Sequence, residues 1–155
     1  MAGYLQADAF RTVVMHTPLI AIDLLVLNEH GQVLLGERLN RPAQGYWFTP
    51  GGRVRKNESL EQAFRRISHS ELGVQLLMAS ATFRGVYEHF YRDSYFSADE
   101  YDSGTHYVVL AYTLLLADSA LESLPREQHA EYRWVDVRTT SLCVHQHVLD
   151  YFDQG

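Results

Sequence analysis

The stretch GGRVRKNESLEQAFRRISHSELGV, Gly51 to Val74, decides the fold, because it predicts a helix with a turn-rich approach and a definite end. Asn57 is the predicted N-cap, and two acids follow it in the first turn, where the helix dipole favours negative charge. The helix continues to about Leu72. Gly73 then supplies the left-handed residue that ends it.

One face of this helix combines an apolar stripe with a single acid. At about 100° per residue, the stripe consists of Leu60, Ala63, Phe64 and Ile67. Glu71 falls on the same stripe, one turn beyond Ile67. A carboxylate in line with a core stripe is costly to bury unless a metal ion or an arginine receives it. The alternative is that the helix end frays into solvent, and the helical wheel does not decide between the two.

The rest of the chain predicts strands and loops around this helix. Residues 18–27 are apolar at both parities, which indicates a central strand covered on both faces. The other predicted elements are a turn at 28–31, strands at 32–38, 82–91, 105–116 and 132–137, loops at 40–52, 92–104 and 124–131, and a C-terminal helix at 142–152. Strands mixed with a few helices that cover both faces predict an α/β sandwich.

Length and charge narrow the class of protein. The 155 residues suffice for one compact domain with its own core, so residues 1–155 are treated as a single domain. A formal net charge of −6 argues against nucleic acid as a partner. Lys56 is the only lysine among thirteen cations. Arginine suits bidentate phosphate contacts, although lineage bias explains most of the arginines more simply.

The sequence also predicts a location. Cys143 is the only cysteine, so no internal disulfide forms, which fits a reducing compartment such as the cytoplasm. The first twelve residues lack a basic region followed by an apolar run, so we expect no signal peptide. The longest apolar stretch is interrupted by His16, Pro18 and Asp23, so we expect no membrane span.

The helical stretch resembles the Nudix box, G-x5-E-x7-R-E-U-x-E-E-x-G-U, in which U is aliphatic. The matching positions, with every spacing intact, are Gly52, Glu58, Arg66, Glu71, Gly73 and Val74. Ile67 and Ser70 stand where the box has glutamates, and Ser68 departs from the aliphatic position. The resemblance implies a Nudix fold, an α/β/α sandwich with a mixed central sheet. In typical members the helix acids hold one to three divalent ions, so a single acid predicts one ion with ligands from elsewhere.

These departures match an atypical branch, because the chain also resembles the GDP-mannose mannosyl hydrolase family. The shared stretches, between Phe10 and Val135, are TPLIAIDLLV, NRPAQGYWFTPGGRV, FRRISHSELG, EHFY, THYVVLAY and LPREQHAEYRW. The resemblance implies an enzyme that hydrolyses GDP-mannose or a related GDP-hexose at the sugar C1, with inversion, to GDP and free sugar. It also implies a homodimer that acts on a small-molecule nucleotide sugar.

The resemblance assigns roles to particular residues. The ligands of one Mg²⁺, with Mn²⁺ as an alternative, would be the Gly51 carbonyl, the Glu71 carboxylate and the Gln128 side chain. His129 matches the general base. The leaving-group contacts match Arg38, Arg53 and Tyr107, and positions lining the sugar and nucleotide pocket match Asp23 and His89. Arg66 matches the box arginine, which we interpret as a partner holding Glu71.

Structural interpretations stand beside these roles. Asp23 fits a structural hydrogen bond or ion pair as well as a substrate contact, because an isolated charge in an apolar strand is costly. Tyr107 fits a core aromatic, His89 a satisfied polar residue at a strand end, and Glu58 a helix N-terminal acid. Two other functions stay open: a pyrophosphohydrolase that cleaves an NDP-sugar at phosphorus, and a non-catalytic nucleotide-sugar binding module. The preferred GDP-hexose is not predicted.

Overall fold

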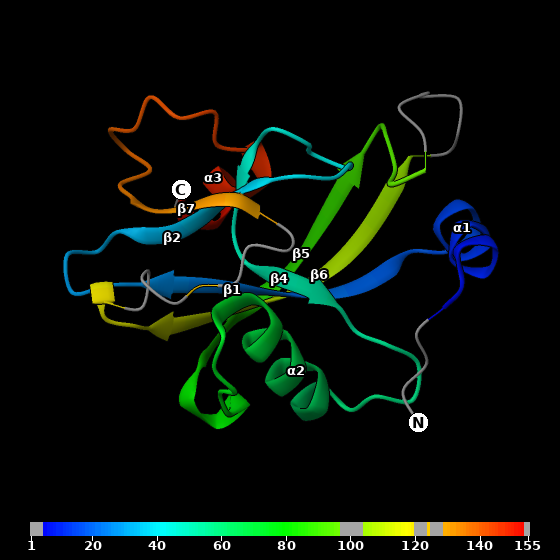
Figure 1. Cartoon of the computed structure of the whole chain (residues 1–155), viewed down its shortest axis with the longest axis horizontal. Coiled ribbons are helices and arrows are strands. Elements are labelled where there is room, and N and C mark those ends of the chain that lie inside the picture. The colour runs from blue at the N-terminus through cyan, green and yellow to red at the C-terminus, as the bar shows by residue number, and fades with distance from the viewer. Residues whose placement is uncertain (1–4, 97–103, 120–123, 125–128, 154–155) are drawn as a thin grey trace.

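The computed structural model describes residues 5–96, 104–119, 124 and 129–153, with only the backbone described at 129 and 130. The elements, shown in Figure 1, are α1 (Ala7–His16), β1 (Leu19–Leu27), β2 (Val33–Arg38), β3 (Trp47–Phe48), β4 (Gly51–Arg53), α2 (Leu60–Leu72), η1 (Met78–Ser80), β5 (Thr82–Tyr91), β6 (Thr105–Leu115), β7 (His129–Val135) and α3 (Gln146–Phe152). Among these residues, no helix has the length and apolar character to cross a membrane.

The strands form one mixed sheet with β1 at its centre. The sheet order is β3-β2-β1-β6-β5, with β4 added on β1 and β7 added on β2. β1 runs parallel to β6 and antiparallel to β2 and β4. Leu24 and Leu25, neighbours that point to opposite faces, are both fully buried. The predicted central strand with two covered faces is therefore confirmed.

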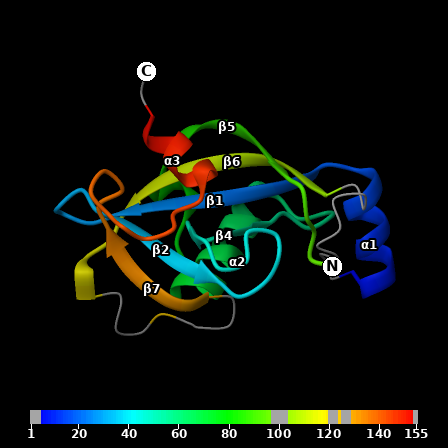
Figure 2. The same cartoon turned by 90° about the horizontal axis from the view of Figure 1, so that it is seen from above.

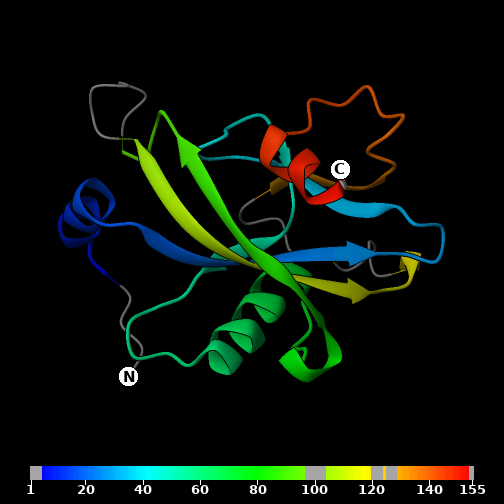
Figure 3. The ribbon, with the colours of Figure 1, turned by 180° about the vertical axis from the view of Figure 1, so that it is seen from behind.

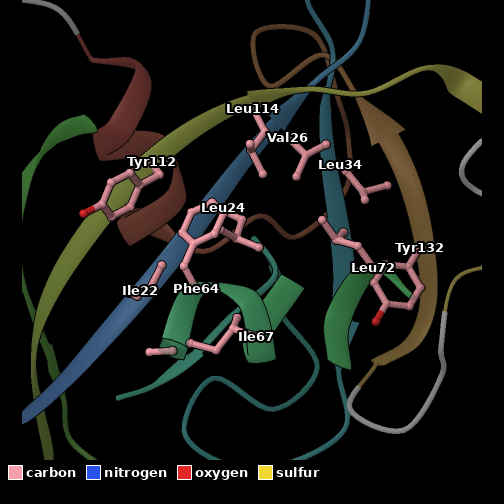
Figure 4. Packing of buried hydrophobic residues seen from close by; sticks show 11 residues of the cluster. Ile22, Leu24, Val26, Leu34, Phe64, Ile67, Leu72, Tyr112, Leu114 and Tyr132 are labelled. Carbon is pink, nitrogen blue, oxygen red and sulfur yellow. The ribbon is translucent and has the colours of Figure 1, made fainter. Parts of the chain in front are cut away.

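Helices cover both faces of the sheet, so the predicted α/β/α sandwich is confirmed. α2 lies on one face, where Figure 4 shows Phe64 and Ile67 packed toward Ile22 and Leu24 of β1. α3 lies on the other face, where Tyr151 forms a small core with Leu25 and Ala111. Figure 1 and the view from behind in Figure 3 show the sheet between the two helices.

The capping of α2 differs from the prediction. Ser59, not Asn57, is the N-cap: its hydroxyl accepts from the Gln62 amide at 3.1 Å, and the Gln62 side chain accepts from the Ser59 amide at 2.9 Å. Helix formation therefore starts at Leu60, whose side chain is 40% exposed rather than part of the core stripe. Gly73 ends the helix with φ 77°, as predicted.

Several predicted boundaries are wrong because tertiary pairing overrides the local pattern. Two short strands lie in the predicted loop at 40–52: β3, which pairs with the preceding strand β2, and β4, which extends to Arg53 and pairs with the more distant β1. The predicted helix at 142–152 begins only at Gln146, because Cys143 and His145 exchange backbone hydrogen bonds with Trp47 instead. β7 occupies 129–135 instead of 132–137, and α1 was not predicted at all. Figures 1 and 2 show α1 at one end of the molecule.

Candidate active site

A cavity of about 610 Å³ gathers most of the residues expected to contact substrate. Its lining includes Asp23 from β1, Arg38 from β2, Arg53 from β4, His89 from β5 and Tyr107 from β6. These residues are far apart in sequence. They meet because β1 pairs with β2, β4 and β6, and β5 pairs with β6, so five strands contribute to the lining of one cavity. The five residues to which the resemblance assigned substrate contacts therefore line one cavity.

Asp23 is the polar centre of the cavity wall. Its side chain is 6% exposed, and its Oδ2 accepts from the Tyr151 hydroxyl at 2.5 Å and from the Thr49 hydroxyl at 3.4 Å. The Tyr151 hydroxyl also lies 3.3 Å from His89 Nε2. Burial raises the pKa of Asp23 to about 6, opposed by the hydrogen bonds of Tyr151 and Thr49 and by the charge of Arg38. Asp23 thus has the structural bonds foreseen for it and also faces the cavity.

Two guanidinium groups give one side of the cavity a positive character. Arg38 Nε donates to the carbonyl of Pro42 at 2.9 Å, which fixes the side chain beside the cavity. The Arg53 guanidinium lies 4.6 Å from the centre of the Phe10 ring, a cation–π distance. Burial raises the pKa of Tyr107, and the charges of Arg38 and Arg53 oppose this, so both cations act on the phenol. The two guanidiniums can neutralise the charge of a diphosphate, and the neutral Tyr107 hydroxyl can donate a hydrogen bond to it.

A smaller pocket of about 150 Å³ adjoins the cavity and holds Glu71. Both hollows are lined by Gly51, Gly52 and Arg53. Glu71 is 3% exposed, and the Gly51 amide donates to its carboxylate at 3.4 Å. The alternative of an exposed carboxylate on a frayed helix end is therefore wrong. A Cβ at Gly51 would lie 2.5 Å from Asp23 Oδ1, so only glycine lets the β4 backbone pass between the two carboxylates.

The smaller pocket suits a hard divalent cation. Mg²⁺ prefers carboxylate and carbonyl oxygens, and the pocket offers a buried carboxylate, that of Glu71, beside the Gly51 backbone. The third expected ligand, Gln128, lies outside the described residues. A separate trio of possible ligands, Glu29, His30 and Asp118, is exposed and does not line either hollow among the described residues.

Arg66 has a different partner from the one expected. Its Nε donates to Glu58 Oε2 at 2.7 Å, and its Nη2 donates to Glu58 Oε1 at 2.9 Å and to the Arg53 carbonyl at 2.7 Å. These contacts tie α2 to the loop before it and to β4. The interpretation of Arg66 as the partner holding Glu71 is wrong, because its ion pair is with Glu58. Arg66 does line the small pocket beside Glu71.

The missing box acids have structural replacements. Ile67 is 1% exposed and packs in the α2 core, and its Cγ1 would lie 3.0 Å from a Cβ at Gly52. The Ser68 hydroxyl donates to the Arg65 carbonyl at 3.0 Å and accepts from the Leu76 amide at 2.9 Å, which fastens the segment after α2. Ser70 lines the small pocket but offers no carboxylate.

The backbone of His129 is the first residue of β7 and pairs with Arg38 of β2. The strand register therefore places the backbone of the expected base beside Arg38, whose side chain lines the cavity. Its side chain lies outside the described part of the structure, so the predicted catalytic role of His129 stays a prediction.

A cluster of histidines behind the cavity was missed by the sequence interpretation. His147 of α3 stacks on His89, with ring centres 4.2 Å apart and planes 3° apart, and His145 lies 4.6 Å from His147. Burial, followed by the neighbouring imidazoles, lowers the pKa of His89 to about 3 and that of His145 to about 4. The available signal was the pair of closely spaced histidines, His145 and His147, just before the C-terminal apolar run.

The histidine cluster predicts an acid-sensitive fold. An unfolded histidine binds a proton near pH 6.5, whereas folded His89 stays neutral to about pH 3. Because the unfolded state binds more protons in this window, the stabilisation is fully present above pH 6.5 and is lost as pH falls. Between pH 7 and pH 5 the free energy of unfolding, measured with urea, should therefore fall in the wild type. In His89→Gln this fall should be smaller by about 2 kcal/mol. Replacing the exposed His16 should leave the loss unchanged; the same result for both variants would contradict the account.

The Arg66–Glu58 pair predicts a stability effect that is separate from catalysis. The Glu58 side chain is only 5% exposed, and its bonds to Arg66 hold its pKa below the usual range. Glu58→Gln should lower the free energy of unfolding by about 1–3 kcal/mol, because a charge-assisted pair loses one partner's charge. Glu61→Gln, at an exposed position in the first turn of the same helix, should change it by less than about 0.5 kcal/mol. Equal losses in thermal or denaturant unfolding would argue against this role.

Comparison with known proteins places the fold and the helix motif in a family. The family model described as the NUDIX domain matches residues 17–148. The chain belongs to the NUDIX domain family, and its class is that of the Nudix hydrolases. A MutT NUDIX hydrolase from Burkholderia pseudomallei has a similar structure, with a TM-score of 0.69 and 24% identity over 90% of this chain and 98% of that one. The NUDIX domain of Shewanella oneidensis NrtR, solved with ADP ribose, gives 0.61 and 20% over 96% and 91%.

A relative with higher sequence identity is the low-salt glycan biosynthesis protein Agl8 of Haloferax volcanii. It is 38% identical over 146 residues, which cover 94% of this chain and 87% of the relative. The two solved structures share the fold with this chain, whereas this relative also shares more than a third of the aligned residues across nearly the whole length.

Proposed function

We propose that the protein hydrolyses a GDP-hexose, GDP-mannose or a close analogue, at C1 of the sugar, with inversion, releasing GDP and free sugar. The observation that carries the proposal is a single cavity that combines a buried carboxylate, Asp23, with two guanidiniums and adjoins a second pocket with one helix acid, Glu71. Such a site can bind a polar sugar on one side and a diphosphate on the other.

The proposed chemistry needs only a base from the protein, because a diphosphate is already a good leaving group. Glycoside cleavage otherwise needs an acid for the leaving oxygen and a base for the water. Arg38, Arg53 and the Tyr107 hydroxyl would bind the departing diphosphate as its charge develops. His129, at the start of the strand paired with Arg38, would take a proton from the attacking water. Attack at C1 from the face opposite the diphosphate inverts the anomeric carbon.

The composition of α2 supports attack at carbon. A site that activates water at phosphorus through several ions needs several helix acids, whereas here Ile67 is in the core and Glu71 remains. Glu71, the Gly51 carbonyl and Gln128 would hold one Mg²⁺, or Mn²⁺ in its place. When bound, such an ion supplies electrostatic stabilisation of the leaving diphosphate. The ion would thus act on the leaving diphosphate, and His129 would remove the proton from the attacking water.

The name of the Haloferax volcanii relative, a glycan biosynthesis protein, supports a nucleotide sugar as substrate, because glycan synthesis uses activated sugars. We place the protein in the cytoplasm as a single-domain homodimer, without nucleic-acid or membrane partners. These assignments rest on the family resemblance and on the net charge of −6.

A substrate panel tests the proposal. GDP-, UDP- and ADP-hexoses are incubated with the protein and either Mg²⁺ or Mn²⁺, and the products are separated. GDP and free hexose are expected, with GDP-hexoses preferred. Nucleoside monophosphate and sugar-1-phosphate would establish the pyrophosphohydrolase alternative. Tight binding of a GDP-hexose without any product, also at alkaline pH, would establish the binding-module alternative.

A further inference from the structure

The C-terminal helix α3 contacts the cavity wall through His147, which stacks on His89, and through Tyr151, which bonds to Asp23. The Tyr151 side chain is completely buried, and its ring packs edge-on against Tyr87 with ring centres 4.6 Å apart. Tyr151 does not line the cavity among the described residues, whereas Asp23 and His89 do. Its hydroxyl lies 2.5 Å from Asp23 Oδ2 and 3.3 Å from His89 Nε2. Tyr151, which does not line the cavity, thus contacts Asp23 and His89, which do.

Both ends of Tyr151 are fixed. The hydroxyl end is held by the carboxylate of Asp23, and the backbone carbonyl accepts from two guanidinium nitrogens of Arg84 on β5. The Arg84 guanidinium also lies 5.6 Å from the centre of the Phe152 ring. A side chain with fixed ends inside a packed core has little freedom to move. The position of the phenol is therefore set by α3 and β5 together.

The hydrogen bonds of Asp23 are distributed unevenly between its two oxygens. The Tyr151 and Thr49 hydroxyls both donate to Oδ2, while Oδ1 lies on the side of Gly51. Charged or titratable groups from other elements also act here: Arg38 of β2 acts on Asp23, and Asp23 acts on Tyr91 of β5 and Tyr107 of β6. His147 of α3 and His145, the N-cap of that helix, act on His89. The shortest hydrogen bond of Asp23 is that with Tyr151, so the phenol helps to fix Oδ2 in place and leaves Oδ1 on the side of Gly51, a residue that lines the cavity.

We infer that Tyr151 is a positioning residue, which orients the carboxylate of Asp23 and the ring of His89 for contact with the hexose. The inference rests on the proposed function for the identity of the bound sugar and for the contact of Asp23 and His89 with it. Nothing in the sequence pattern indicates this role, because Tyr151 occupies an apolar position of a C-terminal helix 128 residues away from Asp23. α3 is in this view part of the site, although none of the described residues of α3 lines the cavity.

Tyr151→Phe tests the inference, because phenylalanine keeps the packing and removes only the hydroxyl. We expect kcat/KM for the GDP-hexose to fall roughly tenfold, the value of one hydrogen bond to a charged group, while the Kd of GDP changes less than about twofold. In an Asp23→Asn background the same change should cost less than about twofold, since it acts through Asp23. Tyr87→Phe is the matched control, removing a phenol hydroxyl from the same contact, and should leave kcat/KM unchanged. Additive effects of the two substitutions would overturn the inference.

A second measurement, by nuclear magnetic resonance, does not depend on turnover. In the wild-type protein the Tyr151 hydroxyl proton should appear as a slowly exchanging downfield proton resonance with a nuclear Overhauser contact to the His89 ring. In Tyr151→Phe the side-chain carboxyl resonance of Asp23 and the ring nitrogens of His89 should shift. If these signals change but no GDP-hexose is cleaved, the positioning role stands and the proposed function fails. If the proton is absent and the signals do not change, the positioning role fails whatever the enzyme cleaves.

Discussion

Replacing His129 by glutamine is expected to lower kcat for GDP-hexose hydrolysis by about 10²–10⁴, the usual value of general-base help. Glutamine is close in size and forms hydrogen bonds but cannot accept a proton near neutral pH. The affinities of the His129→Gln variant for Mg²⁺ and for GDP should stay within about threefold of those of the wild type. The measurement is steady-state release of GDP as a function of pH.

The pH profile makes this prediction specific. The wild-type rate should rise with pH through the titration of one imidazole, and the glutamine variant should lose that step. The control is His16→Gln, in α1, at an exposed position. If the His129 variant keeps more than half of the wild-type kcat with an unchanged profile, the base is another residue and the assignment by resemblance is wrong.

Replacing Glu71 by glutamine should have the second large effect. Among the described residues, Glu71 is the one carboxylate that lines the small pocket. Its loss should weaken Mn²⁺ binding by at least about 100-fold, measured by calorimetry or by the spectrum of free Mn²⁺. The rate with Mg²⁺ should fall by roughly 10³, corresponding to several kcal/mol of lost electrostatic stabilisation. Stability should change little or increase, because a buried carboxylate is replaced by a neutral amide.

Glu61→Gln on the same helix is the matched control and should leave metal binding and rate unchanged. If the Glu71 variant bound metal with wild-type affinity, the carboxylate of Glu71 would not be a metal ligand. In that case the buried acid would have a structural role, with the Gly51 amide as its recorded donor.

Periodicity and capping rules predicted the main elements because they reflect local physics. The stripe of Phe64 and Ile67 predicted the buried face of α2, and Gly73 predicted its end. Those rules placed the N-cap at Asn57 instead of Ser59, since both residue types cap helices and only the bond to Gln62 distinguishes them. Short strands such as β3 have no periodicity of their own and depend on partners elsewhere in the chain.

The site residues that belong to a sequence motif could be predicted. Contacts that depend only on tertiary packing could not. Motif spacing indicated Glu71 as buried and functional, and the structure finds it buried. The partner of Arg66 was predicted wrongly, because Glu58 lies just before the N-cap Ser59, in a segment whose path no pattern fixes. The bond between Tyr151 and Asp23 had no sequence signal, since it depends on how α3 packs across the sheet.

The central claim is attack of water at the sugar carbon. The direct test is hydrolysis of a GDP-hexose in ¹⁸O-enriched water with Mg²⁺, with both products analysed by mass spectrometry. The account predicts one ¹⁸O atom at C1 of the released hexose and none in GDP. Label in a nucleotide phosphate, accompanied by unlabelled sugar-1-phosphate, would contradict it.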